Sequence, residues 1–128
     1  ESSGHEAACE LLTRAPRPTA LFAANDCMAV GALSALREAG LRVPEDMVIT
    51  GFDDITSSSY LTPRLTTVRV EAFRLGDRAV QMLVATMRGP SSAPPRHEVL
   101  PTFLVVRESS GAAVSPGRPM TPHSQSAS

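Results

Sequence analysis

The sequence of 128 residues contains no tryptophan, one tyrosine and four phenylalanines. Sugar sites usually stack the sugar on an aromatic face, so a sugar site built from this chain alone would lack that element. Any such rings would come from another part of the protein. The chain also has no apolar run of the roughly 18 residues that a membrane span requires, so we expect no membrane partner.

An excess of charge of one sign is also missing, because 12 basic residues stand against 13 acidic ones, for a net charge of −1. A surface that binds nucleic acid needs a basic face, so we do not expect this chain to contact DNA by itself. The first residues lack a methionine and also the charged-then-apolar pattern of a secretory signal. We therefore expect a fragment or a processed product.

Groups that carry chemistry are few and scattered. Cys9 and Cys27 have neither metal nor redox spacing and are interpreted as free thiols, which favours a reducing cytoplasm. His5, His97 and His123 fall on an opening helix, a late strand and the tail, so no metal site and no base for Cys27 is indicated. A glycine-rich phosphate loop is missing too. The sequence predicts no enzyme, no metal and no cofactor.

Residues 19–54 organise the chain, because they alternate strand, helix and strand. Residues 20–24 and 47–52 are short apolar runs, and residues 27–39 have the length and content of a helix that ends at Gly40. A unit of this size makes its two strands parallel, with a right-handed crossover. We therefore predict an α/β fold with a parallel sheet flanked by helices.

A polar residue follows each of these strands, Asn25 after the first and Asp53 after the second. In open α/β sheets, ligands bind at this edge. Two interpretations stay open here. Either an amide and a carboxylate converge on a small polar ligand, or Asn25 and Asp26 only cap the helix and Asp53 and Asp54 only begin a turn. Adjacent strand residues point to opposite faces, so Asp53 and Asp54 are not expected to act as a pair.

The helix at 27–39 has an unusually apolar surface. A helix that covers one face of a sheet is normally polar over about half of its circumference. Val30, Leu33 and Leu36 are therefore available to a second partner. A homodimer contact and a neighbouring helix would both account for them.

Other segments surround this unit. Residues 3–6 match a capping box, so a helix is expected to begin there, and the strand that should precede it is missing or frayed. Residues 65–70 are predicted to form a strand, and residues 71–88 an amphipathic helix. Residues 97–107 contain two strand-like pieces divided by a proline. Residues 108–128 are small and polar, which predicts a disordered tail.

Six short motifs occur along the chain: AND at 24–26, GAL at 31–33, VP at 43–44, GFDD at 51–54, LTTV at 65–68 and LPTFLVVRES at 100–109. In combination they resemble the end of the LacI/GalR family of bacterial transcription regulators. The resemblance covers about residues 1–110 and is highly specific, although each motif alone is weak.

The resemblance implies part of a type I periplasmic-binding-protein-like lobe, with a helix-turn-helix, a hinge and most of a first lobe expected before Glu1. Residues 1–64 would belong to the second lobe, and residues 65–107 would cross into the first lobe and return. The implied function is sensing of a small-molecule effector, a sugar or nucleoside-like compound, within a cytoplasmic dimeric regulator. Operator DNA would be bound only through the absent N-terminal domain. The alternative is a fragment of a sugar-binding transport protein, and the chain's ending favours the regulator.

The resemblance also implies site residues. Asn25 and Asp53 match the amide and the carboxylate that bond the effector, and Leu75 and Ala72 match positions that line the pocket. An aromatic residue is common at the Ala72 position, so this site would be more open or would bind something different.

The homodimer implied by the family would use Val30 and Leu61, with Leu33 on the same helix as Val30. The crossing helix would have lost its own sheet in this chain. At about 25 cal/mol per Å² of apolar surface, leaving its apolar face in water sacrifices several kcal/mol. We therefore expect the helix to pack back onto the chain's own sheet or to exchange with a second copy. A single chain with that helix projecting into solvent would contradict this expectation.

Overall fold

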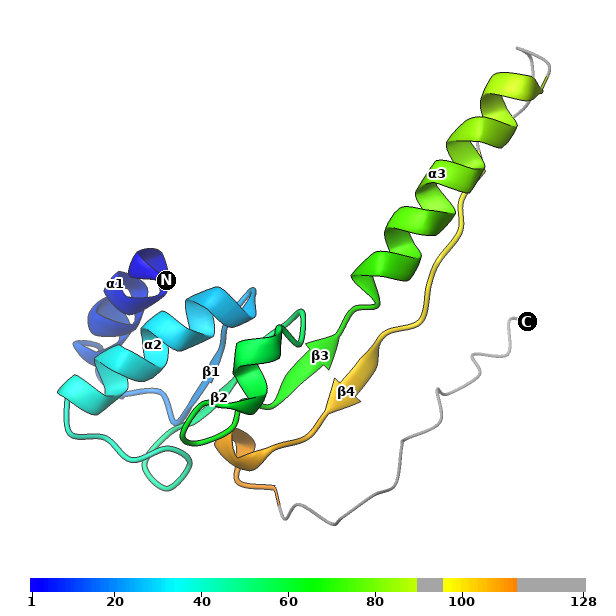
Figure 1. The fold of residues 1–128 in the computed structure, drawn as a ribbon. Coiled ribbons are helices and arrows are strands. Elements are labelled where there is room, and N and C mark those ends of the chain that lie inside the picture. Colours follow the sequence, from blue (N-terminus) through cyan, green and yellow to red (C-terminus); the bar gives the residue numbers. More distant parts are fainter. Residues whose placement is uncertain (90–95, 113–128) are drawn as a thin grey trace, which may run out of the picture.

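The computed structural model describes residues 1–89 and 96–112. Figure 1 shows the order of the elements. The chain begins with helix α1 (Ser2–Leu12), strand β1 (Ala20–Phe22), helix α2 (Asp26–Glu38) and strand β2 (Val48–Thr50). It continues with the 3-10 turn η1 (Thr56–Ser59), strand β3 (Thr67–Arg69), helix α3 (Ala72–Arg88), strand β4 (Phe103–Val105) and the 3-10 turn η2 (Glu108–Ser110). We call the part formed by α1, β1, α2, β2, η1 and η2 the body.

The predicted strand–helix–strand unit is present. Strands β1 and β2 pair in parallel with Leu21 opposite Ile49, and α2 connects them. Both strands are shorter than the apolar runs 20–24 and 47–52, because only three residues of each form the ladder. The first residues of the next segment extend the sheet through a parallel bridge between Thr50 and Thr66. This confirms the α/β fold with a parallel sheet.

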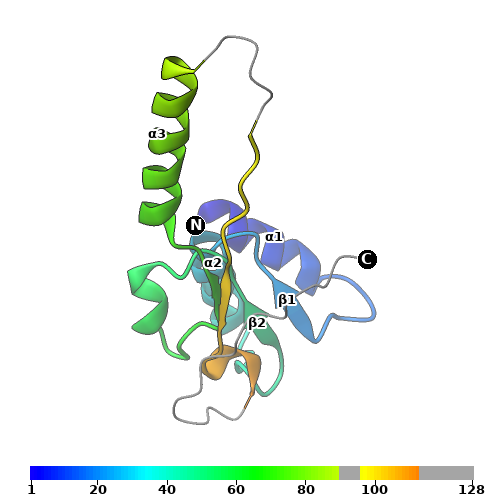
Figure 2. The same ribbon diagram turned by 90° about the vertical axis from the view of Figure 1, so that its right-hand side faces the viewer.

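Helix α1 packs against α2, and the two helices lie side by side in both views of the ribbon (Figures 1 and 2). A Cβ atom at Gly4 would overlap the backbone of Met28, and one at Gly31 would overlap the carbonyl oxygen of Glu1. The two glycines therefore allow the helix backbones to approach closely. Of the two explanations for the apolar second face of α2, the neighbouring helix is the one found within this chain.

Both helix starts differ from the prediction. The capping box at residues 3–6 is wrong, since α1 already begins at Ser2 after Glu1 and has no side-chain cap. Helix α2 is capped by Asn25, whose Oδ1 accepts a hydrogen bond of 2.8 Å from the amide of Met28. Asp26 is the first helical residue and is fully buried, because its carboxylate bonds to other elements. Asn25 rather than Asp26 is therefore the cap.

The amphipathic helix predicted at 71–88 is found as α3, but its packing was predicted wrongly. None of its residues is buried, and it projects away from the body in both views (Figures 1 and 2). Strands β3 and β4 pair antiparallel and lead to it. Because these strands direct the helix outward, its apolar face does not return to the chain's own sheet. The projecting helix contradicts the expectation that it would pack back.

The C-terminal segment also differs in its limits. Only Phe103–Val105 forms a strand within residues 97–107, on the far side of the proline. Disorder from residue 108 is contradicted for the first residues of the tail, because η2 is ordered and Ser109 is fully buried. Residues 113–128 and most of the loop at 91–96 lie outside the described residues. None of the helices described here has the length and apolar character needed to cross a membrane.

Candidate functional site

The two polar residues predicted to converge do lie at one edge of the sheet. The amide of Ala23 donates to the carbonyl of Thr50 at 2.8 Å, and the amide of Asp26 donates to the carbonyl of Phe52, also at 2.8 Å. Asn25 directly precedes Asp26, and Asp53 directly follows Phe52. The backbone therefore places Asn25 and Asp53 at the same edge of the sheet, where β1 and β2 end.

Asn25 keeps hydrogen-bonding capacity beyond its role as the cap of α2. Its Oδ1 caps α2, and its side chain is half-buried. Within residues 1–89 and 96–112, its Nδ2 makes no hydrogen bond. The side chain can therefore cap the helix and still offer two N–H donors to a ligand.

Asp53 is exposed and has a φ of 112°, in a region that side-chain-bearing residues rarely adopt. Such a conformation costs about 1–3 kcal/mol and tends to occur at functional sites. The backbone is held there by hydrogen bonds with β3, from the Asp53 amide to the Val68 carbonyl at 2.9 Å and from the Val70 amide back to Asp53 at 3.4 Å. The strained residue therefore lies exposed at the sheet edge that also carries Asn25.

Asp54 differs sharply from its neighbour. Its side chain is 6% exposed and forms ion pairs with Arg107 at 2.6 Å and Arg69 at 2.7 Å. Burial raises the pKa of the Asp54 carboxyl, but hydrogen bonds from Arg69 and Arg107 lower it by more, so its pKa lies below the ordinary value. Asp53 faces solvent while Asp54 faces arginines, so the two carboxylates do not share a proton.

The two pocket positions from the resemblance lie on the first turns of α3. The amide of Ala72 donates to the carbonyl of Val70, the residue whose own amide contacts Asp53. Leu75 stands one turn further and is 51% exposed. The structure thus places both residues on the segment that follows β3, and both are exposed.

The candidate dimer residues separate into two kinds. Val30 and Leu61 are half-buried and keep some surface. Leu33 is 6% exposed and belongs to the core that α1, α2 and the sheet share. Leu33 therefore has little surface to offer a second subunit.

The sequence did not indicate the role of Asp26. Its Oδ1 accepts from the Thr67 hydroxyl at 2.6 Å, and its Oδ2 accepts from the Ser58 hydroxyl at 2.6 Å and the Ile55 amide at 3.0 Å. A Cβ at Gly51 would overlap the same carboxylate. The carboxylate therefore joins α2, η1 and β3 next to the sheet edge that carries Asn25 and Asp53.

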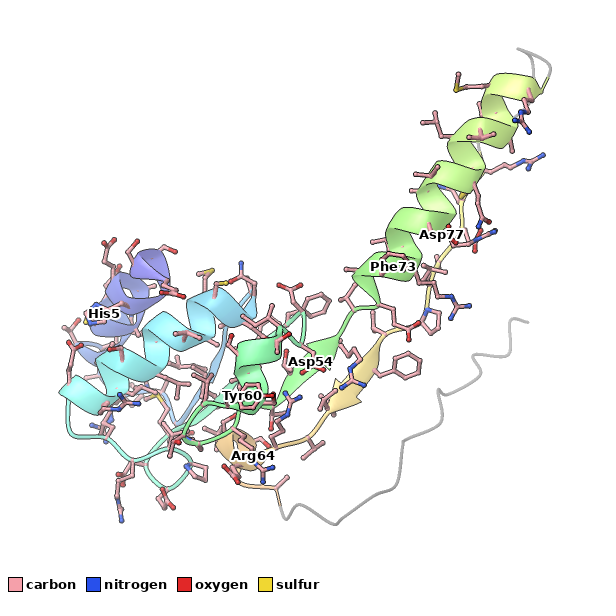
Figure 3. All side chains as sticks on the ribbon, in the orientation of Figure 1. His5, Asp54, Tyr60, Arg64, Phe73 and Asp77 are labelled. Atoms are coloured by element: carbon pink, nitrogen blue, oxygen red, sulfur yellow. The ribbon has the colours of Figure 1, made fainter. Side chains whose placement is uncertain are left out.

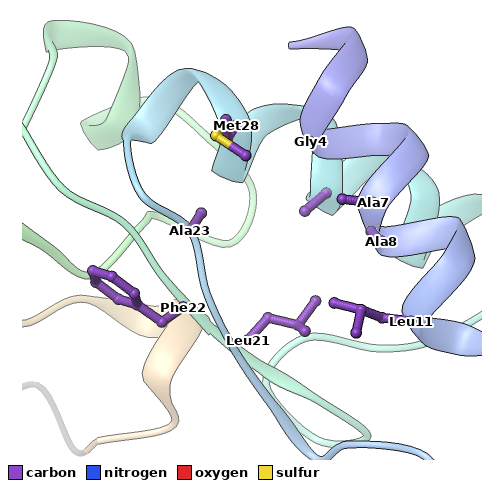
Figure 4. A pocket seen from close by; sticks show the side chains of 9 residues that line it. Gly4, Ala7, Ala8, Leu11, Leu21, Phe22, Ala23 and Met28 are labelled. Carbon is purple, nitrogen blue, oxygen red and sulfur yellow. The ribbon is translucent and has the colours of Figure 1, made fainter. Parts of the chain in front are cut away.

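A small hollow of about 60 Å³ lies elsewhere, between α1, β1 and α2 (Figure 4). Its lining carries no polar side chain, so it does not suit a ligand rich in hydroxyl groups. The lining residues are Gly4, Ala7, Ala8, Leu11, Leu21, Phe22, Ala23, Met28 and Ala32. The edge with Asn25 and Asp53 is the better candidate for a polar effector.

Comparison with known proteins places this geometry in context. Residues 1–110 match the family described as periplasmic binding protein-like domain. The transcriptional repressor PurR of Haemophilus influenzae is 54% identical over 81 residues, which are 63% of this chain and 24% of that protein. The chain therefore spans about a quarter of that relative's length.

Solved structures give the same picture. The regulator CelR in complex with cellobiose superposes with a TM-score of 0.79 and 42% identity, over 84% of this chain and 33% of that one. The lac repressor dimer bound to operator and the anti-inducer ONPF superposes with a TM-score of 0.77 and 36% identity, over 85% of this chain and 32% of that one.

Proposed function

The chain belongs to the LacI/GalR family of transcription regulators, within its periplasmic binding protein-like domain, and from this premise we propose that it senses a small-molecule effector. The sensing part would act in a dimeric, cytoplasmic regulator that binds operator DNA through a separate helix-turn-helix. It would shift the regulator between conformations with different affinity for DNA, and it would not be an enzyme. The repressor relatives favour this function over the transport protein, which shares the fold.

The observation that carries the proposal is that Asn25 and Asp53 lie at the same edge of the sheet. An amide that donates and a carboxylate that accepts are complementary to hydroxyl groups, each of which has a donor and an acceptor. This chemistry suits a sugar or the ribose of a nucleoside. The cellobiose bound to CelR supports a sugar, although the scarcity of aromatic rings here means that stacking surfaces would come from elsewhere.

Helix α3 supports a second lobe. None of its residues is buried, and apolar side chains such as Leu83 and Met87 are 60% and 76% exposed. In the proposed regulator, the first lobe would cover this face, and Leu75 and Ala72 would line the effector pocket from that side. The sheet edge with Asn25 and Asp53 would then form half of the effector site.

Dimerisation is the other part of the proposal. Val30 and Leu61 are both partly exposed, and Leu61 packs against the margin of the core, so they remain the residues proposed for the subunit contact. Leu33 is left out of that surface, because it is buried within the chain.

A direct test begins with the coding sequence. We expect the reading frame upstream of the Glu1 codon to encode a helix-turn-helix and a first lobe. The full-length protein should then be stabilised against heat by one member of a panel of cellobiose, ribose, lactose and adenosine. A stop codon immediately upstream, or an upstream domain without a helix-turn-helix, would contradict the regulator.

Two substitutions test whether Asp53 and Asn25 bind the effector in the full-length protein. Asp53→Ala should abolish effector binding while operator binding remains. Asn25→Asp is the sharper variant at the other position, because aspartate still caps α2 but can no longer donate to the ligand. Calorimetry should show loss of effector affinity in both variants and none in Glu45→Ala, an exposed acid on a loop. Unchanged effector affinity in either variant, Asp53→Ala or Asn25→Asp, would reject the assignment of that residue to the effector site.

A further inference from the structure

Helix α3 joins the body through two strands. β3 leads out of the body and β4 leads back, and they pair antiparallel with Val68 opposite Leu104. Figure 3 shows Asp54 at the base of these strands, where they leave the body. Any relative movement of the body and the α3 segment must therefore pass through β3 and β4.

One carboxylate holds both strands at that base. Oδ2 of Asp54 accepts from Nε of Arg69 in β3, and Oδ1 accepts from Nη2 of Arg107, two residues after β4. Arg107 is 14% exposed and also donates through Nη1 to the carbonyl of Leu65 at 2.8 Å. Its backbone amide bonds the hydroxyl of Thr66 at 2.8 Å. The outgoing and returning segments are thus tied to each other and to Asp54.

The same dipeptide carries the candidate ligand carboxylate. Asp53 and Asp54 have φ angles of 112° and 55°, so both depart from extended geometry. The Asp53 amide bonds β3 at Val68, and the Asp54 amide reaches the hydroxyl of Thr67 at 3.4 Å. A ligand that moves Asp53 will move Asp54, because the conformation of one residue constrains the next.

We propose that Asp54 is a positioning residue that transmits effector binding at Asp53 to the crossover strands β3 and β4. This role rests on the proposed function. Two sites are coupled when both bias the same structural element, and here the element is the Asp53–Asp54 dipeptide with its ties to β3. A purely structural ion pair would stabilise the domain without changing how β3 and β4 respond to ligand.

The test measures that response in the full-length regulator. The probe is the compound from cellobiose, ribose, lactose and adenosine that stabilises the protein most. Its binding should slow amide hydrogen exchange in β3 and β4 by about tenfold, within the range of typical allosteric coupling. Asp54→Asn should keep the probe's affinity within about threefold while removing this change in exchange.

Two further variants sharpen the result. Arg69→Gln removes only the ion pair between Asp54 and β3, so the exchange response should be lost in β3 and kept in β4. This variant also provides the test if Asp54→Asn does not fold, because Arg69 is half exposed. Glu108→Gln is the matched control, since it removes a neighbouring ion pair, with Arg64 at 2.7 Å, that does not touch the dipeptide. Its exchange response should equal that of the wild type.

The outcomes separate the coupling role from the proposed function. A normal exchange response in Asp54→Asn or in β3 of Arg69→Gln would overturn the coupling role while leaving effector sensing intact. Loss of probe affinity in Asp54→Asn as large as in Asp53→Ala would also overturn it, because Asp54 would then act in binding. A wild-type protein that binds no probe would refute the proposed function, and the coupling role with it.

Discussion

Removal of the Asp26 carboxylate should destabilise the body more than any exposed substitution. The side chain is completely buried, and three donors depend on it: the hydroxyls of Ser58 and Thr67 and the amide of Ile55. A buried donor left without a partner costs about 1–3 kcal/mol, so Asp26→Ala would lose about 3–9 kcal/mol from the three. Relief from burying a charge offsets several kcal/mol of this. We expect a net loss of about 3 kcal/mol in the free energy of unfolding.

Asp26→Asn should be intermediate. The amide oxygen can take the position of Oδ2 and keep the bonds from Ser58 and Ile55, while the amide nitrogen donates to the hydroxyl of Thr67. The variant then loses only the strengthening that a charged acceptor provides, about 1 kcal/mol. The order of stability should be wild type, Asp26→Asn, Asp26→Ala.

Urea unfolding followed by far-UV circular dichroism can measure these differences. Fluorescence is less suitable, because the chain has no tryptophan and Tyr60 is 81% exposed. The slope of the transition should stay constant, so that a change in midpoint reports stability. Ser57→Ala is the control, as an exposed neighbour of Ser58, and should lie within about 0.5 kcal/mol of wild type. An Asp26→Ala variant within about 1 kcal/mol of wild type would refute the reasoning.

Three other outcomes follow from the structure. Gly31→Ala should lose about 1–3 kcal/mol in urea unfolding because its Cβ meets the α1 backbone, whereas Gly76→Ala, with open space around it, should raise the helicity of α3. The pKa of Asp54 is lowered on folding, so its contribution is complete above the unfolded value of about 3.9 and disappears as pH falls through the folded pKa. Unfolding measured from pH 6 to pH 2 should therefore show a weaker acid dependence in Asp54→Asn. Leu83→Lys should leave the urea midpoint of the body unchanged, because α3 buries no residue; a lower midpoint would show hidden packing.

Local patterns predicted much of the fold. The apolar runs around 20–24 and 47–52, with a helix between them, led correctly to the parallel pairing of β1 and β2. The same pattern led to Asn25 and Asp53 at one edge. The start of α2 was misjudged by one residue because asparagine and aspartate cap helices about equally well. The choice is decided by Ser58 and Thr67, which lie 32 and 41 positions from Asp26 and which no local pattern connects to it.

The prediction of how α3 packs was wrong for a different reason. Its amphipathic pattern correctly predicted a helix, but a pattern specifies that a face is apolar and not which surface covers it. In this chain, β3 and β4 determine the direction of the helix, and they lead it away from the body. The pairing of these strands depends on register between segments separated by the whole of α3, which composition does not reveal.

The buried polar residues gather at the base of the crossover. Within residues 1–89 and 96–112 they lie on α2, on η1, on β3 with the residue before it, and on η2: Asp26, Ser58, Thr66, Thr67 and Ser109. They are joined by hydrogen bonds, since Asp26 accepts from Ser58 and Thr67, and the Ser109 hydroxyl accepts from the Thr66 amide and donates to the Ile49 carbonyl.

A buried polar network that is fully satisfied favours one arrangement strongly over its alternatives, because a shifted arrangement would leave donors unpaired. An apolar core tolerates small shifts far better. In a sensor of the proposed kind, the elements around Asn25 and Asp53 must keep their geometry, so that ligand binding changes the conformation of β3 and β4 and not only that of the nearest residues. The network lies between the Asn25–Asp53 edge and the start of β3, where that rigidity is needed. We therefore expect Ser58→Ala, which removes one donor to Asp26, to weaken the exchange response of β3 to the probe even where the fold persists. An unchanged response would argue that the network serves stability alone.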